Sequence, residues 1–149
     1  MLMHVLKLKN NNDYIVLRIE GYEFENFKDN IEWLMLYGKV ASGKRKVEGE
    51  DPTIETTDFE YLKKWAQRLI RTKQNSFWET TEPNLYFRYE KADNTLEIYF
   101  CPERTQAKEG KFISGLSFKK ECTNEDLEKI VKWCDGCMQV FPIRTPEEN

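Results

Sequence analysis

Two of the four cysteines, Cys134 and Cys137, have the spacing of a redox pair. Such a pair acts through a low-pKa thiolate at the start of a helix, where the helix dipole stabilises negative charge. Here apolar residues at helical spacing predict a helix that begins at Thr123 and ends near Met138. Both cysteines fall at the C-terminal end of that helix, where the dipole disfavours a thiolate. We therefore interpret Cys134 as a core residue and Gly136 as a residue that loosens the helix end.

The other cysteines and the single histidine do not form a recognisable site. Cys101 and Cys122 are 21 positions apart, whereas structural zinc sites usually show two close cysteine pairs. Because no secretory signal is visible, free thiols are expected rather than disulfides. His4 falls on the apolar face of an early strand, and no nucleophile motif accompanies it. The sequence therefore predicts neither a zinc site nor a histidine-dependent catalytic centre.

Neighbouring acidic residues have the chemistry needed for acid–base catalysis. Glu79 with Glu82 and Glu50 with Asp51 are two such pairs, but the chain has 26 acidic residues, so chance pairs are expected. Nothing in the sequence fixes the separation of either pair or raises a carboxyl pKa. No glycine-rich phosphate-binding loop is present. We predict a protein without catalytic activity, cofactor or metal, and a carboxylate-based enzyme remains an alternative.

The composition limits the class of protein. A content of 40% hydrophobic and 13% aromatic residues argues against disorder, and 149 residues fit one domain. The formal net charge of −3 argues against nucleic-acid binding. No apolar run approaches the roughly 18 residues of a membrane span, and no signal peptide is recognisable. We expect one cytoplasmic domain over residues 1–149, frayed at residues 142–149, that binds neither nucleic acid nor membrane.

Strands and helices follow from the apolar periodicity. The strands are expected at residues 2–9, 14–22, 32–40, 45–51, 77–80, 85–91, 95–100 and 111–119. Both faces are apolar over residues 33–37, which predicts a central strand or one covered on both sides. Pro52 should end the fourth strand, and Thr57 and Glu60 should form a capping box at the first helix. The pattern predicts an α+β fold, with a largely antiparallel, curved or partly closed sheet of about seven to eight strands and two packed helices.

Acidic residues gather in the middle of the chain, with no lysine or arginine among them. They are Glu48, Glu50, Asp51, Glu55, Asp58 and Glu60. Basic residues gather on either side, at residues 39–46 and 63–73. An acidic surface can steer a basic partner and speed its association. Charge runs are also common on ordinary solvated surfaces, so the sequence leaves both interpretations open.

Two motifs follow one another in the middle of the chain. An acidic segment that ends in Glu48-Gly-Glu-Asp-Pro52 precedes a capped helix, and the motif Glu82-Pro83-Asn84-Leu85 then leads into a hairpin. In this order, over roughly residues 32–118, the chain resembles the WapI family of bacterial immunity proteins. The resemblance implies a small cytoplasmic protein that binds and neutralises the C-terminal toxin domain of a WapA-type surface protein. Such toxins are commonly nucleases, several of which act on tRNA.

The expected partner is therefore a cognate toxin domain, bound by a monomer or weak dimer. Carboxylates can imitate phosphates in a basic nuclease cleft, and exposed aromatic residues are common interface anchors. The candidate partner-binding residues are Glu48, Glu50, Asp51, Glu55, Asp58, Trp78 and Tyr86. The alternative function is a small-molecule or peptide binding module whose aromatic residues line a pocket in the sheet.

Overall fold

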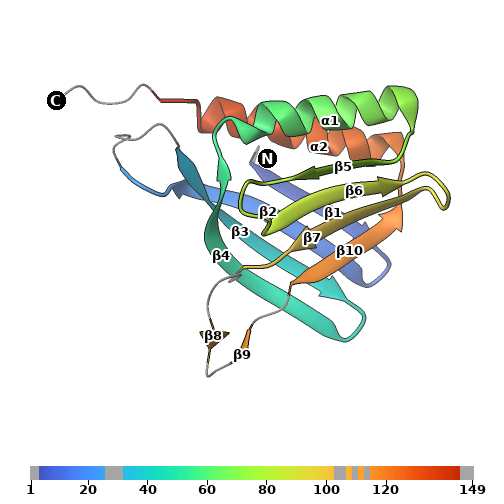
Figure 1. Cartoon of the computed structure of the whole chain (residues 1–149), viewed down its shortest axis with the longest axis horizontal. Helices are drawn as coiled ribbons and strands as arrows, with labels where there is room; N and C mark the ends of the chain where they lie inside the picture. Colours follow the sequence, from blue (N-terminus) through green and yellow to red (C-terminus); the bar gives the residue numbers. More distant parts are fainter. Residues whose placement is uncertain (1–3, 26–31, 103–106, 109–110, 113–114, 145–149) are drawn as a thin grey trace.

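The strands form two four-stranded antiparallel sheets (Figure 1). The structure, a computed structural model, describes residues 4–25, 32–102, 107–108, 111–112 and 115–144. The first sheet has the order β1 (Val5–Asn10), β2 (Asp13–Tyr22), β3 (Trp33–Ser42) and β4 (Arg45–Glu55). The second sheet has the order β10 (Leu116–Glu121), β7 (Thr95–Phe100), β6 (Leu85–Glu90) and β5 (Ser76–Glu79). A short pair, β8 (Ala107–Lys108) and β9 (Lys111–Phe112), stands apart from both sheets.

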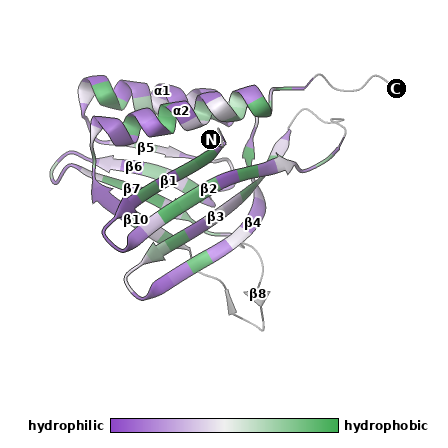
Figure 2. Ribbon diagram, turned by 180° about the vertical axis from the view of Figure 1, so that it is seen from behind, coloured by the Kyte–Doolittle hydropathy of each residue, from purple (hydrophilic) through white to green (hydrophobic). Residues whose placement is uncertain are grey.

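Two helices lie side by side along one edge of the sheets, as Figures 1 and 2 show from opposite sides. They are α1 (Asp58–Thr72) and α2 (Asn124–Val140). Helix α2 contacts β1 and helix α1 contacts β5, so the pair joins an edge of one sheet to an edge of the other. The α+β class and the antiparallel pairing are confirmed. The strands divide between two sheets that do not close into a barrel.

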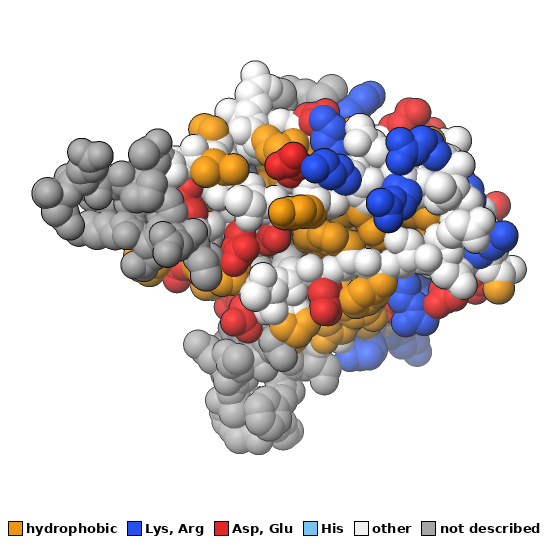
Figure 3. Space-filling view, turned by 45° about the horizontal axis from the view of Figure 1, so that its top comes forward, with side chains coloured by type: hydrophobic (Ala, Val, Ile, Leu, Met, Phe, Trp, Pro, Cys, Tyr) orange, Lys and Arg blue, Asp and Glu red, His pale blue; other side chains and the backbone are white. Residues whose placement is uncertain are grey.

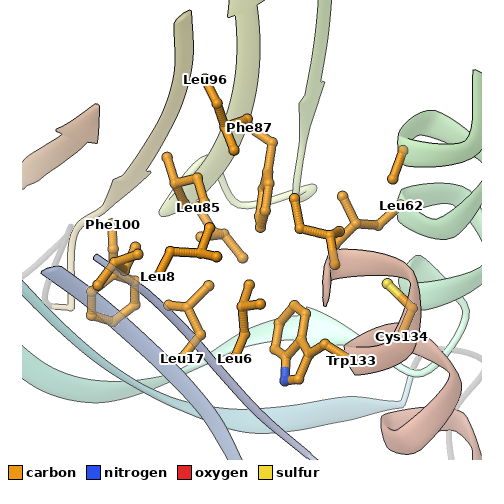
Figure 4. Packing of buried hydrophobic residues seen from close by; sticks show 14 of the residues in the cluster. Leu6, Leu8, Leu17, Leu62, Leu85, Phe87, Leu96, Phe100, Trp133 and Cys134 are labelled. Carbon is orange, nitrogen blue, oxygen red and sulfur yellow. The ribbon is translucent and has the colours of Figure 1, made fainter. Parts of the chain in front are cut away.

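One continuous hydrophobic core fills the space between the sheets and the helices (Figure 4). Both sheets contribute the residues of one face, because side chains alternate along a strand. The sheets approach closely at Gly38 on β3, where an added Cβ would lie 2.4 Å from the Phe100 ring of β7. Glycine is therefore required at this position, since any larger residue would displace the fully buried Phe100 ring.

The expected end of β4 is wrong, because the strand runs past Pro52 to Glu55. Pro52 pairs with Met35, and a register shift follows between Met35 and Leu34. Strand β4 is an edge strand of its sheet, where a missing backbone N–H removes no necessary ladder bond. The last expected strand also differs, because β9 and β10 are separate elements. Strand β1 begins at Val5, and residues 1–3 lie outside the described residues.

The two helix starts differ from each other. The capping box expected at Thr57 is wrong: its backbone is already helical, with φ −76° and ψ −18°, and its side chain makes no capping hydrogen bond. At α2, extended Thr123 accepts a hydrogen bond from the Asp126 N–H, and the Asp126 carboxylate accepts from the Thr123 N–H. Thr123 is thus confirmed as the N-cap. Helix α2 continues to Val140, so Gly136 lies buried within it and does not loosen its end.

The segment after α2 is anchored as far as Arg144, although the sequence placed it in a frayed tail. The Tyr22 hydroxyl donates to the Pro142 carbonyl over 2.7 Å. The Arg144 Nε lies 2.6 Å from the buried Glu32 Oε2, and its guanidinium carbon lies 3.6 Å from the centre of the Tyr22 ring. Residues 145–149 lie outside the described residues. No helix in the described part of the chain is both long and apolar enough to cross a membrane.

Candidate partner-binding site

The alternation of β4 divides the acidic stretch between two faces of the first sheet. Glu48 and Glu50 pair with Lys39 and Tyr37 and lie on the outer face, away from the core. Asp51 pairs with Leu36, a fully buried core residue, and lies on the inner face. The structure therefore keeps Glu48 and Glu50 together and separates Asp51 from them.

Glu48 and Tyr37 are linked on the outer face. The Tyr37 hydroxyl donates a hydrogen bond to Glu48 Oε2. Burial and this negatively charged neighbour raise the pKa of Tyr37 to about 12. The Arg18 guanidinium carbon lies 4.4 Å from the centre of the Tyr37 ring, and Arg18 forms a 2.7 Å ion pair with Glu20. These contacts hold a carboxylate, an aromatic ring and a guanidinium in one arrangement on the surface.

Asp51 joins a contact between the two sheets. The Asn84 Nδ2 atom donates to Asp51 Oδ2 over 3.2 Å and to the Cys101 carbonyl over 3.0 Å. Only 3% of Asn84 is exposed. These hydrogen bonds connect β4, the β5–β6 turn and the segment after β7. The position of Asp51 thus supports a role in packing.

Glu55 and Asp58 lie at the junction between β4 and α1. The Glu55 N–H donates to Asp58 Oδ2 over 2.8 Å. Burial raises the pKa of Asp58 to about 6, and the nearby Glu55 carboxylate adds to the shift. Burial also raises the pKa of Glu55, which pairs with Trp33 at the end of β3. Glu55 belongs to the sheet, whereas Asp58 closes the turn into the helix.

The two aromatic candidates lie on opposite faces of the second sheet. Trp78 is half-buried and packs edge-on against Phe87 on the core side, with ring centres 5.8 Å apart. Tyr86 lies on the outer face and stacks on Tyr99 at 4.8 Å. Phe77 lies 5.3 Å from Tyr86 and is 50% exposed. Figure 3 looks onto this sheet and α1, and shows hydrophobic side chains between a mainly acidic and a mainly basic side.

The motif Glu82-Pro83-Asn84-Leu85 builds the turn between β5 and β6. The Asn84 N–H donates to the Glu82 carbonyl over 2.6 Å, and the Asn84 carbonyl accepts from the Cys101 N–H over 2.8 Å. Leu85 is fully buried and points into the core in Figure 4. In this structure the buried part of the motif, Asn84 and Leu85, has a structural role.

Sequence reasoning missed the outer stripe of β3, formed by Trp33, Met35 and Tyr37. These residues are half-buried, and none of them belongs to the core cluster or packs against it. The apolar character of both faces of β3 was the signal. It correctly placed β3 inside a sheet, between β2 and β4. It could not tell that both helices lie along one edge of the sheets, away from this outer face (Figure 2).

The cysteines lie in the core. Cys134 and Cys137 are fully buried along α2, and none of the four cysteines forms a disulfide. Burial raises the pKa of the Cys134 and Cys137 thiols far above the usual range. This environment suppresses the thiolate that redox chemistry requires. No group of His, Cys, Asp and Glu side chains in the described ranges is arranged to hold a metal ion.

The profile of the immunity protein WapI-like family matches residues 5–142. The chain belongs to this family. No curated protein and no solved structure matched the chain. The match extends from the first residue of β1 to beyond α2 and thus includes both sheets of this WapI-like protein, both helices and every candidate partner-binding residue. Family membership suggests a role in toxin immunity and identifies no particular toxin.

Proposed function

We propose that this WapI-like protein binds and neutralises a cognate toxin domain of a WapA-type surface protein. The observation that carries the proposal is the family match over residues 5–142. We further propose that it acts as a single domain in the cytoplasm, as a monomer or weak dimer, and by stoichiometric binding without catalysis. The suppressed thiols support a binding role, because they provide no activated nucleophile.

A nuclease is the toxin class that the surface charge supports best. Glu48, Glu50 and Glu55 lie on one strand at the edge of the first sheet. Carboxylates presented in this way can occupy the positions of phosphates in a basic cleft, and their field increases the rate of encounter. The core aromatic residues Phe87 and Phe100 are fully buried. The binding-module alternative would therefore use the open hollow of about 460 Å³ beside Tyr86 and Tyr99, which charged residues such as Arg45 and Lys119 also line.

Co-expression tests the proposal. The C-terminal domain of a candidate cognate WapA-type toxin is produced in a host whose growth it arrests. We expect the full chain to restore growth and to co-purify with the toxin domain in equimolar amounts. Growth arrest that persists while the chain accumulates as a folded protein would refute the proposed function.

A further inference from the structure

We propose that the outer face of β2, β3 and β4 is the surface on which the toxin docks, with basic groups of the toxin over β4. This inference rests on the proposed function and specifies its site. We call this surface the docking face. It consists of Arg18, Trp33, Met35, Tyr37, Glu48, Glu50 and Glu55.

The strand registers place these side chains in rows across the sheet. Arg18, Tyr37 and Glu50 form one row, because Arg18 pairs with Tyr37 and Tyr37 with Glu50. Trp33 and Glu55 form another row at the end of the same strands. Apolar side chains therefore occupy the central strand, and carboxylates occupy the neighbouring edge strand.

The composition of the docking face is that of a protein interface. Tryptophan, tyrosine, methionine and arginine are enriched in interfaces. Tryptophan, tyrosine and arginine also dominate binding hot spots. The three apolar residues of β3 are half-buried yet take no part in the core. Both helices lie away from them (Figures 1 and 2). No described helix or strand therefore covers the apolar stripe of Trp33, Met35 and Tyr37, which has carboxylates on one side.

Charge polarity on this face fixes the chemistry of the partner. The β4 side carries Glu48, Glu50 and Glu55. Basic residues lie around Glu48, in the same row and on the same strand: Lys39 pairs with Glu48, Lys7 and Lys39 both pair with Val16 of β2, and Lys46 lies at the start of β4. A basic cleft is therefore attracted to Glu50 and Glu55 and repelled from the lysines around Glu48. The proposed complex has a defined orientation, in which the phosphate-binding groups of the toxin lie over the part of β4 that carries Glu50 and Glu55.

Existing contacts hold this face ready for binding. The Tyr37 hydroxyl bonds Glu48, and Arg18 lies over the Tyr37 ring at 4.4 Å. Side chains that are already ordered in the free protein lose less conformational entropy on association. Four long, paired strands also provide a rigid base for these residues.

Matched substitutions on the two outer faces test the proposal. The variants Trp33→Ala and Glu50→Lys change the docking face, and the control variants Phe77→Ala and Glu79→Lys make the same kinds of change on the outer face of the second sheet. The probe is the toxin domain that the chain neutralises in the co-expression test, separated from its complex in denaturant and refolded. We expect each docking-face variant to raise Kd at least about tenfold and each control to change it less than about twofold.

The kinetics separate the two contributions. Trp33→Ala should mainly accelerate dissociation, whereas Glu50→Lys should slow association and weaken its dependence on salt. Circular dichroism spectra and thermal unfolding verify that each variant is folded. Equal affinity of all four variants, or loss of affinity only in the controls, would overturn the docking face while leaving the proposed function intact. Failure of the wild-type chain to bind the toxin would instead refute the proposed function.

Hydroxyl-radical footprinting tests the same face without substitution, so it does not depend on the folding of any variant. We expect the toxin to lower the oxidation of Trp33, Met35 and Tyr37 several-fold and to leave Phe77 and Tyr99 unchanged. Protection of Phe77 and Tyr99 with unchanged oxidation of the β3 residues would overturn the proposal.

Discussion

Replacing Asn84 by aspartate should make the stability of the protein strongly dependent on pH. The Asn84 Nδ2 atom donates to Asp51 Oδ2 over 3.2 Å and to the Cys101 carbonyl over 3.0 Å. The variant Asn84→Asp replaces this donor by a carboxyl group that faces two acceptor oxygens. Only 3% of Asn84 is exposed, so the new carboxyl group is buried. Two carboxylates that share a buried site cannot both remain ionised, so the pKa of the new carboxyl rises.

The magnitude follows from the size of that pKa shift. If the carboxyl stays protonated in the folded protein at neutral pH, raising its pKa from about 4 to at least 7 costs about 4 kcal/mol of unfolding free energy at pH 7. Below about pH 4 both the folded and unfolded forms are protonated, and the carboxyl can again donate to Asp51. The loss should then fall to about 1 kcal/mol, because one of two hydrogen bonds remains unmade.

Urea unfolding at about pH 4 and pH 7.5 measures this difference. Asn12→Asp is the control, because Asn12 is an exposed residue in the β1–β2 turn and undergoes the same change of charge. We expect the control to shift the unfolding free energy by less than about 0.5 kcal/mol at either pH. A loss at Asn84 that is equal at the two pH values, or no larger than the control, would refute the reasoning.

Three further predictions concern buried groups. The folded-state pKa of Asp58 is raised to about 6, so its ionisation lowers stability as the pH rises from about 4 to 6. Asp58→Asn should therefore add about 2 kcal/mol to the unfolding free energy near pH 7.5 and nothing near pH 4, and destabilisation at pH 7.5 in urea titrations would contradict this. Gly38→Ala should cost about 2–3 kcal/mol in urea unfolding, because the new Cβ would lie 2.4 Å from the Phe100 ring. Phe100→Leu should lower the unfolding free energy less in the Gly38→Ala variant than in the wild-type protein. Strictly additive losses would show that the two positions do not touch. The thiols of Cys134 and Cys137 should react with a thiol reagent only after unfolding, and rapid labelling of the native protein would disprove their burial.

The regular elements could be predicted because their side chains follow a strict period. Alternating apolar residues gave β6 and β7, whose inner residues, Phe87 and Phe100 among them, are fully buried. Helix α1 begins where the sequence placed the first helix, and Phe59 and Leu62 on its inner face are fully buried. In these segments local periodicity and tertiary packing favour the same structure.

The errors occurred where tertiary position overrides local preference. Pro52 normally ends a strand, but β4 is an edge strand and continues through it. Thr57 has the residue type of an N-cap, but its backbone is already helical, and the neighbouring Asp58 accepts a backbone hydrogen bond instead. Neither outcome is encoded in the local sequence.

The candidate site was predictable in its charge and not in its geometry. The sequence identified the acidic stretch, but the separation of Asp51 from Glu48 and Glu50 depends on the register of β4 against β3. The half-buried position of Trp78 depends on which face of β5 meets the core. The positions of the helices decide which apolar face of β3 stays uncovered. No single segment of the sequence specifies those positions.

Titration of toxin activity with the purified protein tests the central claim most directly. The account predicts that activity falls in proportion to the added protein and vanishes at one equivalent, with the chain and the toxin domain both recovered intact from the complex. Full toxin activity in the presence of excess folded protein would contradict neutralisation by binding. Complete inactivation by a small fraction of an equivalent would contradict a stoichiometric, non-catalytic mechanism.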